Sequence, residues 1–145
     1  MKINDLYRQL LSMNADIKKL IKEAEFDNYD DLSGVEIDAD NINERFMREQ
    51  LRAVMQNLQD ASADLNYLKR DITGEYTLYK NGSGRYTDGV KEYSCGNVIE
   101  FCYYDDFDEC DKWDISTVEH NGEDYYIVRH KKLSLEGLKV RRRNA

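Results

Sequence analysis

The sequence predicts an α+β fold, in which an antiparallel, coiled-coil-like helical hairpin precedes a small SH3-like β-barrel. Apolar residues recur at steps of three and four through the first 72 residues, and they alternate with a period of two afterwards. Only one of the eight glycines, Gly34, precedes Thr73, whereas eight of the eleven tyrosines follow it. We therefore expect a helical domain over residues 1–72, and a β-barrel domain with a basic C-terminal tail over residues 73–145.

The longest predicted element is a helix over residues 41–72. Its apolar residues alternate at steps of four and three, which makes an a/d seam of more than three heptads. Asn41 and Glu44 have the spacing of a capping box, and Gly74 occupies the position of a left-handed residue that ends a helix. The seam residues that we expect to face the other helix of the hairpin, or a second copy, are Leu51, Val54, Leu58 and Leu65.

A first helix is predicted over residues 2–25. Its own heptad seam consists of Ile3, Leu6, Leu10, Met13, Ile17, Leu20 and Ala24. The link over residues 26–40 is long enough for the helices to fold back on each other. Its acids are Asp27, Asp30, Asp31, Glu36, Asp38 and Asp40. They lack the central glycine of a calcium-binding loop, so we interpret the link as solvated. Because two helices cannot enclose a core, the hairpin must pack on the β-domain, a second copy or a partner.

The second half of the chain predicts five or six short strands separated by turns at Asn81–Gly84, Asp88–Gly89 and Asn121–Gly122. That number of strands in a short segment is typical of a small barrel of the SH3-like kind. The side chains that we expect in its core are Val98, Phe101, Trp113, Ile115, Tyr126 and Val128.

The same half resembles a small bacterial family known as domain of unknown function 5348. The matching segments are Cys95–Glu100, Trp113, Val118–His120, Tyr125–Val128 and Leu133–Arg141. The last of them, a Leu-x-Leu-Glu-Gly-Leu-x-Val-Arg run, is the most specific. This chain departs from the family in its helical hairpin and in an acidic insertion around residues 103–111. The resemblance implies a compact β-domain from bacterial genes and their mobile elements, and it implies no catalytic residue.

Composition excludes several classes of function. The net charge of −8 argues against a general nucleic-acid or anionic-membrane binder, and no apolar run approaches the length of a membrane span. The odd number of cysteines, Cys95, Cys102 and Cys110, argues against a disulfide framework or a zinc site. We expect a cytoplasmic protein without a cofactor, in which the cysteines serve as small core residues.

A catalytic site would have to use one of only two histidines. Cys95 and His120 could in principle form a nucleophile and base pair. The residues around them contain neither a nucleophile-elbow pattern nor an acid at a spacing that indicates it would orient the histidine. We therefore expect the protein not to be an enzyme.

Charge patterning is the more informative signal. The residues from Arg129 onward hold seven Lys or Arg and one Glu, whereas residues 105–111 hold five acids in seven positions. One interpretation of the acidic run is a solvated loop. The sharper interpretation is a surface that imitates nucleic-acid phosphates and occupies a basic groove of a partner protein. The candidate partner-binding residues are Asp105, Asp106, Phe107, Asp108, Glu109 and Asp111.

Three functions remain open. The sharpest is inhibition of a nucleic-acid-binding defence nuclease, such as a CRISPR nuclease, since anti-CRISPR proteins are similarly small and acidic and come from phage and plasmid genes. The second is a structural or adaptor protein that dimerises through its hairpin. The third is a nucleic-acid binder that uses the basic tail, Arg141, Arg142 and Arg143.

Overall fold

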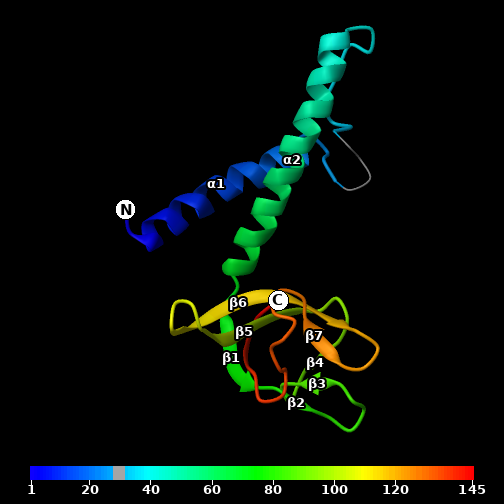
Figure 1. Ribbon diagram of the computed structural model, residues 1–145. Coiled ribbons are helices and arrows are strands. Elements are labelled where there is room, and N and C mark those ends of the chain that lie inside the picture. The colour runs from blue at the N-terminus through cyan, green and yellow to red at the C-terminus, as the bar shows by residue number, and fades with distance from the viewer. Residues whose placement is uncertain (28–31) are drawn as a thin grey trace. The chain divides into compact units, whose positions relative to one another are not determined.

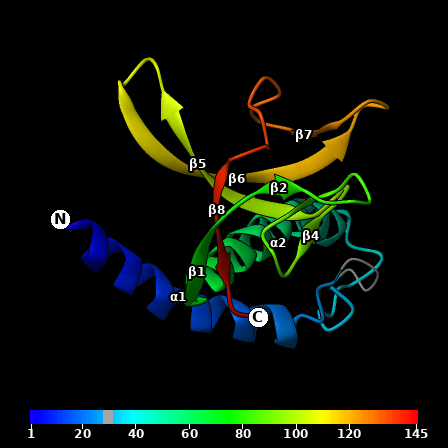
Figure 2. The ribbon, with the colours of Figure 1, turned by 90° about the horizontal axis from the view of Figure 1, so that it is seen from below.

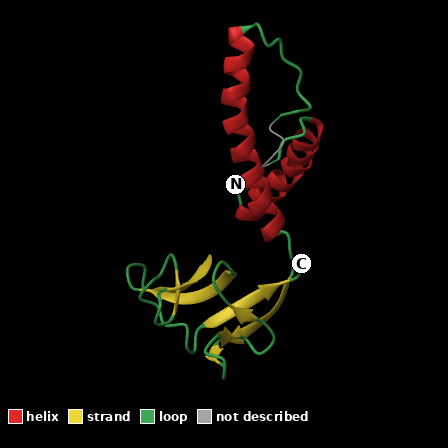
Figure 3. Ribbon diagram, turned by 90° about the vertical axis from the view of Figure 1, so that its right-hand side faces the viewer, coloured by secondary structure: helices red, strands yellow, loops and turns green. Residues whose placement is uncertain are grey.

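The computed structural model describes residues 1–27 and 32–145, which form two compact units, Met1–Arg70 and Asp71–Ala145. Two helices make up the first unit, and antiparallel sheets make up the second, which confirms the α+β class (Figures 1 and 3). Asp30 and Asp31 of the predicted acidic link lie outside the described residues. Neither helix in the described part of the chain has the length and apolarity required to span a membrane.

The helical unit contains α1 (Ile3–Glu23) and α2 (Ile42–Leu68). The predicted N-cap of α2 is confirmed, because the Asn41 side chain accepts hydrogen bonds from the backbone N–H groups of Asn43 and Glu44. The second hydrogen bond of a capping box would join the Glu44 carboxylate to the Asn41 N–H. Here the Glu44 carboxylate instead accepts a hydrogen bond from the Asp38 N–H. These contacts fix the start of α2 at the position that the sequence predicts.

The C-terminus of α2 differs from the prediction. The helix ends at Leu68, and Ile72 and Gly74 belong to strand β1 (Ile72–Thr77). Ile72 pairs with Arg143 and Gly74 pairs with Arg142 in β8 (Lys139–Arg143). The heptad pattern continued to Ile72 in the sequence, but pairing with a strand 70 positions away takes these residues out of the helix.

The contacts between α1 and α2 show that the two helices are antiparallel. Ala24 and Ile21, near the end of α1, pack in one apolar cluster with Met55 and Leu58. Further toward the start of α1, the buried Asn14 donates a hydrogen bond of 3.0 Å to the side-chain oxygen of Asn66. The first turns of α2 extend past the end of α1 (Figure 1).

The predicted seam of α2 is only partly used within this unit. Leu65 is buried and Leu58 is half-buried, but Leu51 is 45% exposed and Val54 is 49% exposed. Leu51 and Val54 therefore contribute little to packing within the unit, and their alternative role against a second copy stays a prediction. The buried stripe of α2 runs through Met55, Ser62 and Leu65, rotated by one position from the a/d seam, and α1 does not reach the first turns.

The β-unit contains a five-stranded sheet in the order β1-β8-β5-β6-β7 and a three-stranded sheet in the order β2-β3-β4, and all pairs are antiparallel. The remaining strands are β2 (Tyr79–Lys80), β3 (Tyr86–Thr87), β4 (Glu92–Tyr93), β5 (Val98–Asp105), β6 (Cys110–His120) and β7 (Tyr125–Ile127). Within residues 71–145, all of which are described, neither sheet closes on itself, so the predicted SH3-like barrel is not confirmed.

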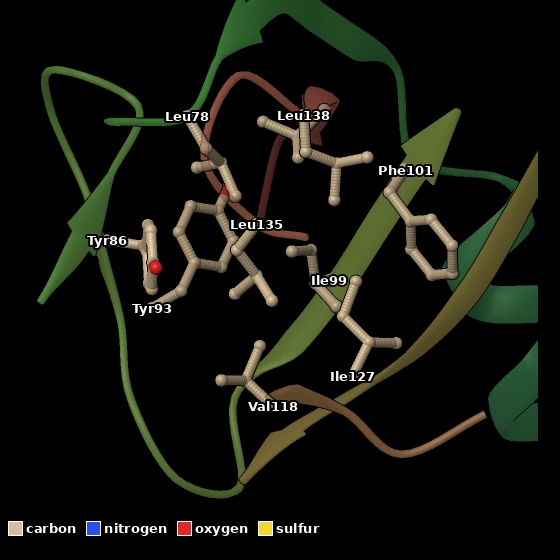
Figure 4. Close-up of a cluster of buried hydrophobic side chains, with 10 residues drawn as sticks. Leu78, Tyr86, Tyr93, Ile99, Phe101, Val118, Ile127, Leu135 and Leu138 are labelled. Carbon is tan, nitrogen blue, oxygen red and sulfur yellow. The ribbon is translucent and has the colours of Figure 1, made fainter. Parts of the chain in front are cut away.

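The core of the β-unit lies on one face of the large sheet (Figure 4). It consists of Leu78, Tyr86, Tyr93, Ile99, Phe101, Val118, Ile127, Leu135, Leu138 and Val140. Only Phe101 among the six predicted core residues belongs to it. Val98, Ile115 and Val128 are exposed, and Trp113 and Tyr126 are half-buried. Apolar side chains occur on both faces of β5 and β6, so the alternation alone did not establish which face is buried.

Candidate functional site

All six predicted partner-binding residues lie at one end of the β5–β6 hairpin, in the segment Asp105–Asp111, which we call the acidic turn. Asp105 is the last residue of β5, and Asp111 is the second residue of β6. The acidic turn joins β5 to β6, and the strand pairing ends at Asp105 opposite Cys110. Asp105 shapes the turn, because its carboxylate accepts hydrogen bonds from the backbone N–H groups of Phe107 at 2.9 Å and Asp108 at 3.4 Å. Figure 2 shows this end of the β5–β6 hairpin projecting from the rest of the β-unit.

The side chains of the acidic turn are largely in solvent. Phe107 is 93% exposed, which is exceptional for an aromatic residue in a folded domain. Asp106, Glu109 and Asp111 are also exposed, and Asp105 is half-buried. The turn therefore presents one aromatic side chain among several carboxylates.

Lys112 neutralises part of this charge. Its ammonium group lies 2.7 Å from Asp105 and also forms an ion pair with Asp108. The hydrogen bond from Lys112 is the main reason that the pKa of Asp105 is lowered, and the same contacts raise the pKa of Lys112 above its usual range. Asp106, Glu109 and Asp111 consequently carry most of the negative charge that is open to a partner.

A groove of about 610 Å³ lies beside the acidic turn. Tyr103, Tyr104 and residues 105–107 line one side, and His130, Lys131, Lys132 and Leu133 line the other. Asp105, Asp106 and Phe107 were predicted as site residues, but His130, Lys131, Lys132 and Leu133 were not, because the loop after β7 is distant from them in sequence. The basic run that begins at Arg129 is the signal in the sequence that could have indicated this side of the groove.

His130 is fixed in the wall of this groove by packing and by a carboxylate. Its ring lies 4.3 Å from the Tyr103 ring, and its Nε2 lies 2.8 Å from Asp114. Asp114 also contacts Arg129 at 3.3 Å. Burial alone would raise the pKa of Asp114, but the His130 hydrogen bond and the other contacts hold it below its usual value. These contacts orient His130 as a structural part of the groove.

Arg141, Arg142 and Arg143 of the predicted basic tail lie in β8, an internal strand of the five-stranded sheet. Arg141 and Arg143, on one face of β8, both pair with the buried carboxylate of Glu100, and the Arg143 Nε lies 2.9 Å from it. The Arg141 guanidinium also stacks on Trp113 at 4.3 Å.

Arg142 points to the other face of β8. Its guanidinium stacks on Tyr76 at 4.3 Å, and its Nε lies 2.9 Å from Asp88, close enough for an ion pair but without hydrogen-bond alignment. All three arginines therefore serve contacts within the β-unit.

The residues considered for catalysis have other environments. The His120 Nδ1 accepts a hydrogen bond from the Gly122 N–H at 3.0 Å, and its ring packs edge-on against Tyr125, so it supports the Asn121–Gly122 turn. Cys95 and Cys110 are exposed and Cys102 is half-buried, which corrects the prediction that they are core residues. Among residues 1–27 and 32–145, no three His, Cys, Asp or Glu side chains gather closely enough to bind a metal ion.

Comparison with known proteins agrees with this division of the chain. Residues 76–142 match the family described as a domain of unknown function (DUF5348), so the C-terminal half resembles that family, as the sequence predicted. The matched segment contains both the acidic turn and the groove beside it. No curated protein and no solved structure matches the chain.

Proposed function

We propose that this chain is a non-enzymatic protein-binding module whose acidic turn docks into a basic groove of a partner protein. The observation that carries the proposal is the exposure of Phe107, 93%, at a projecting turn whose neighbours are carboxylates. Burying an aromatic side chain supplies interface energy, and complementary charge around it directs encounter and orientation.

The turn is preorganised for such a contact. Two backbone N–H groups bind Asp105, and Lys112 ties Asp105 to Asp108. A turn held in one conformation loses less entropy on binding than a flexible loop does. The carboxylates of Asp106, Glu109 and Asp111 would thus be presented to a partner from a fixed frame.

The most specific form of the proposal is mimicry of a nucleic acid. Carboxylates on a rigid turn can occupy lysine and arginine sites that otherwise bind phosphates. The partner would then be a nucleic-acid-binding defence nuclease of the bacterial cytoplasm, such as a CRISPR nuclease. The protein, encoded by a mobile element, would act as its inhibitor, as anti-CRISPR proteins do.

The test is to capture partners from a bacterial lysate with the full chain and with Asp106→Asn/Glu109→Gln/Asp111→Asn, and then to assay captured nucleases for inhibition. We expect the variant to lose inhibition by about tenfold or more, because three charged contacts are removed. Inhibition by the original chain should also weaken at high salt, since salt screens exposed charges.

The matched control is Asp16→Asn/Asp60→Asn/Asp64→Asn. These three acids are exposed residues of the helical unit, and replacing them makes the same change in net charge. Inhibition should be unaffected in this variant. Equal loss in both variants would attribute the effect to net charge, and full inhibition by the acidic-turn variant would reject the proposal.

Direct nucleic-acid binding through Arg141, Arg142 and Arg143 receives less support, because Glu100 and Asp88 pair with these residues. A gel-shift assay with duplex DNA, repeated across salt concentrations, should therefore show no specific complex. The adaptor alternative requires dimerisation through the helical unit and does not involve the acidic turn.

A further inference from the structure

The helical unit contains an apolar groove of about 390 Å³ at the end of α1. The lining includes buried apolar residues, the exposed Glu36 and Glu44, and the half-buried Arg48. Its exposed apolar side chains are Leu20 of α1, Val35 of the link, and Met47, Leu51 and Val54 of α2. These five side chains are between 41 and 54% exposed. The α2 residues that line the groove lie between positions 44 and 58, and the first turns of that helix extend past the end of α1 (Figure 1).

The α2 side of the groove has the spacing of a helix-binding surface. Met47, Leu51, Val54 and Leu58 follow one another at steps of four, three and four. Such a stripe packs best against another helix with the same heptad repeat. The chain itself supplies that helix, because α2 of a second copy carries an identical stripe.

The stripe is self-complementary in an antiparallel arrangement. A two-fold axis between Leu51 and Val54 sets Leu51 of each copy against Val54 of the other, and Met47 against Leu58. The four positions that flank the stripe are Arg48, Gln50, Met55 and Asn57. Only Arg48 among these four positions is charged, so like charges do not face each other across the stripe, although Glu36 and Glu44 also line the groove.

The apolar area exposed in the groove indicates how strongly two copies should associate. The five exposed side chains offer roughly 400 Å² of apolar surface per copy, and a stable interface needs about 500 Å² or more per partner. Polar residues at the edges of α1 and α2 would supply the rest. An interface at this lower limit is expected to associate in the micromolar range rather than as an obligate dimer.

We infer that this groove is a homodimer interface in which α2 of a second copy lies antiparallel on the Met47–Leu58 stripe. The inference is independent of the acidic turn, which lies in the other unit. The proposed dimerisation and the proposed partner binding also differ in their response to salt. Apolar packing of helices persists at high salt, whereas binding through exposed carboxylates weakens.

The test is sedimentation of the full chain over a range of concentrations at low and high salt. We expect reversible dimers in both conditions. Leu51→Asp and Val54→Asp, measured singly, should each weaken dimerisation at least about tenfold, because a carboxylate would be buried without a partner. Circular dichroism confirms that each variant keeps its helices, and Val54→Ser repeats the test with a neutral polar residue.

The matched control is Met13→Asp, which adds the same charge at a 57% exposed position on α1 outside the groove. It should leave the dimer intact. The inference is overturned if the chain is monomeric up to a concentration on the order of 100 µM. It is also overturned if the folded groove variants dimerise as well as the original chain, or if Met13→Asp disrupts the dimer equally.

Discussion

Two charged segments of the β-unit are similarly dense in sequence, but the fold treats them in opposite ways. In β8, three consecutive arginines are all paired or stacked within the unit, two with Glu100 and one with Asp88. In the acidic turn, Lys112 reaches Asp105 and Asp108, while Asp106, Glu109 and Asp111 remain exposed. A charged run in the sequence therefore identifies a binding surface only when its place in the fold is known.

Strand geometry explains the difference. Consecutive side chains of a strand point to opposite faces, so Arg141 and Arg143 meet Glu100 while Arg142 meets Asp88. Glu100 lies directly opposite Arg141 in the neighbouring strand β5. The acidic turn ends the β5–β6 hairpin, so its central residues have no neighbouring strand and their side chains diverge into solvent. The predictions below test this contrast, beginning with the largest expected effect.

Removing the carboxylate at Glu100 should be severely destabilising. Glu100→Ala leaves Arg141 and Arg143 without their shared partner in a largely buried setting, which typically costs about 3–5 kcal/mol. Urea unfolding followed by the fluorescence of Trp113, the only tryptophan, measures this loss. Glu75→Ala is the control, since Glu75 pairs with Lys139 in the same sheet but is half exposed. We expect a change below about 1 kcal/mol for the control, and equal losses in the two variants would contradict the contrast.

Asp88 should contribute stability that depends on pH. Burial alone would raise its pKa, but hydrogen bonds from the Lys91 and Val90 N–H groups and the Tyr93 hydroxyl, together with Arg142, hold it below the usual value. The folded state therefore favours the ionised form. Its contribution is complete above the unfolded pKa of about 4 and is lost as pH falls through the lower folded pKa.

Asp88→Asn should accordingly destabilise the β-unit by about 1–3 kcal/mol at neutral pH. The difference from the original chain should shrink in acid, where the original carboxylate is protonated as well. Urea unfolding at several pH values measures both effects. A difference that stays constant from neutral pH to below pH 3, roughly a unit under the usual aspartate pKa, would show that the charge of Asp88 is not responsible.

Neutralising the acidic turn should have the smallest effect on folding. Asp106→Asn/Glu109→Gln/Asp111→Asn removes exposed carboxylates, and we expect a change within about 0.5 kcal/mol, or slight stabilisation because like charges no longer repel. The same urea titration applies. A loss above about 1 kcal/mol would mean that these acids stabilise the hairpin. The capture experiment could then not distinguish lost binding from lost folding.

The sequence predicted individual elements better than their surroundings. The N-cap of α2 at Asn41 and the strands on both sides of the Asn121–Gly122 turn depend on local signals, and both are observed. Errors arose where local patterns were ambiguous. Both faces of β5 carry apolar side chains, so Val98 was predicted as core in place of Ile99. On α2, two apolar stripes lie side by side, and α1 covers the one centred on Met55.

By itself, the sequence determined the α+β class, the helix and strand periods, and the charge of each segment, because these follow from residue spacing and chemistry within a few turns or strands. The tertiary structure alone decided which charges are neutralised and which apolar stripe stays open. Glu100 and Arg143 are 43 residues apart, and Met55 and Ala24 are separated by the link. Pairings over such separations depend on the register of the sheet and on the rotation of each helix, and neither is encoded in a local pattern.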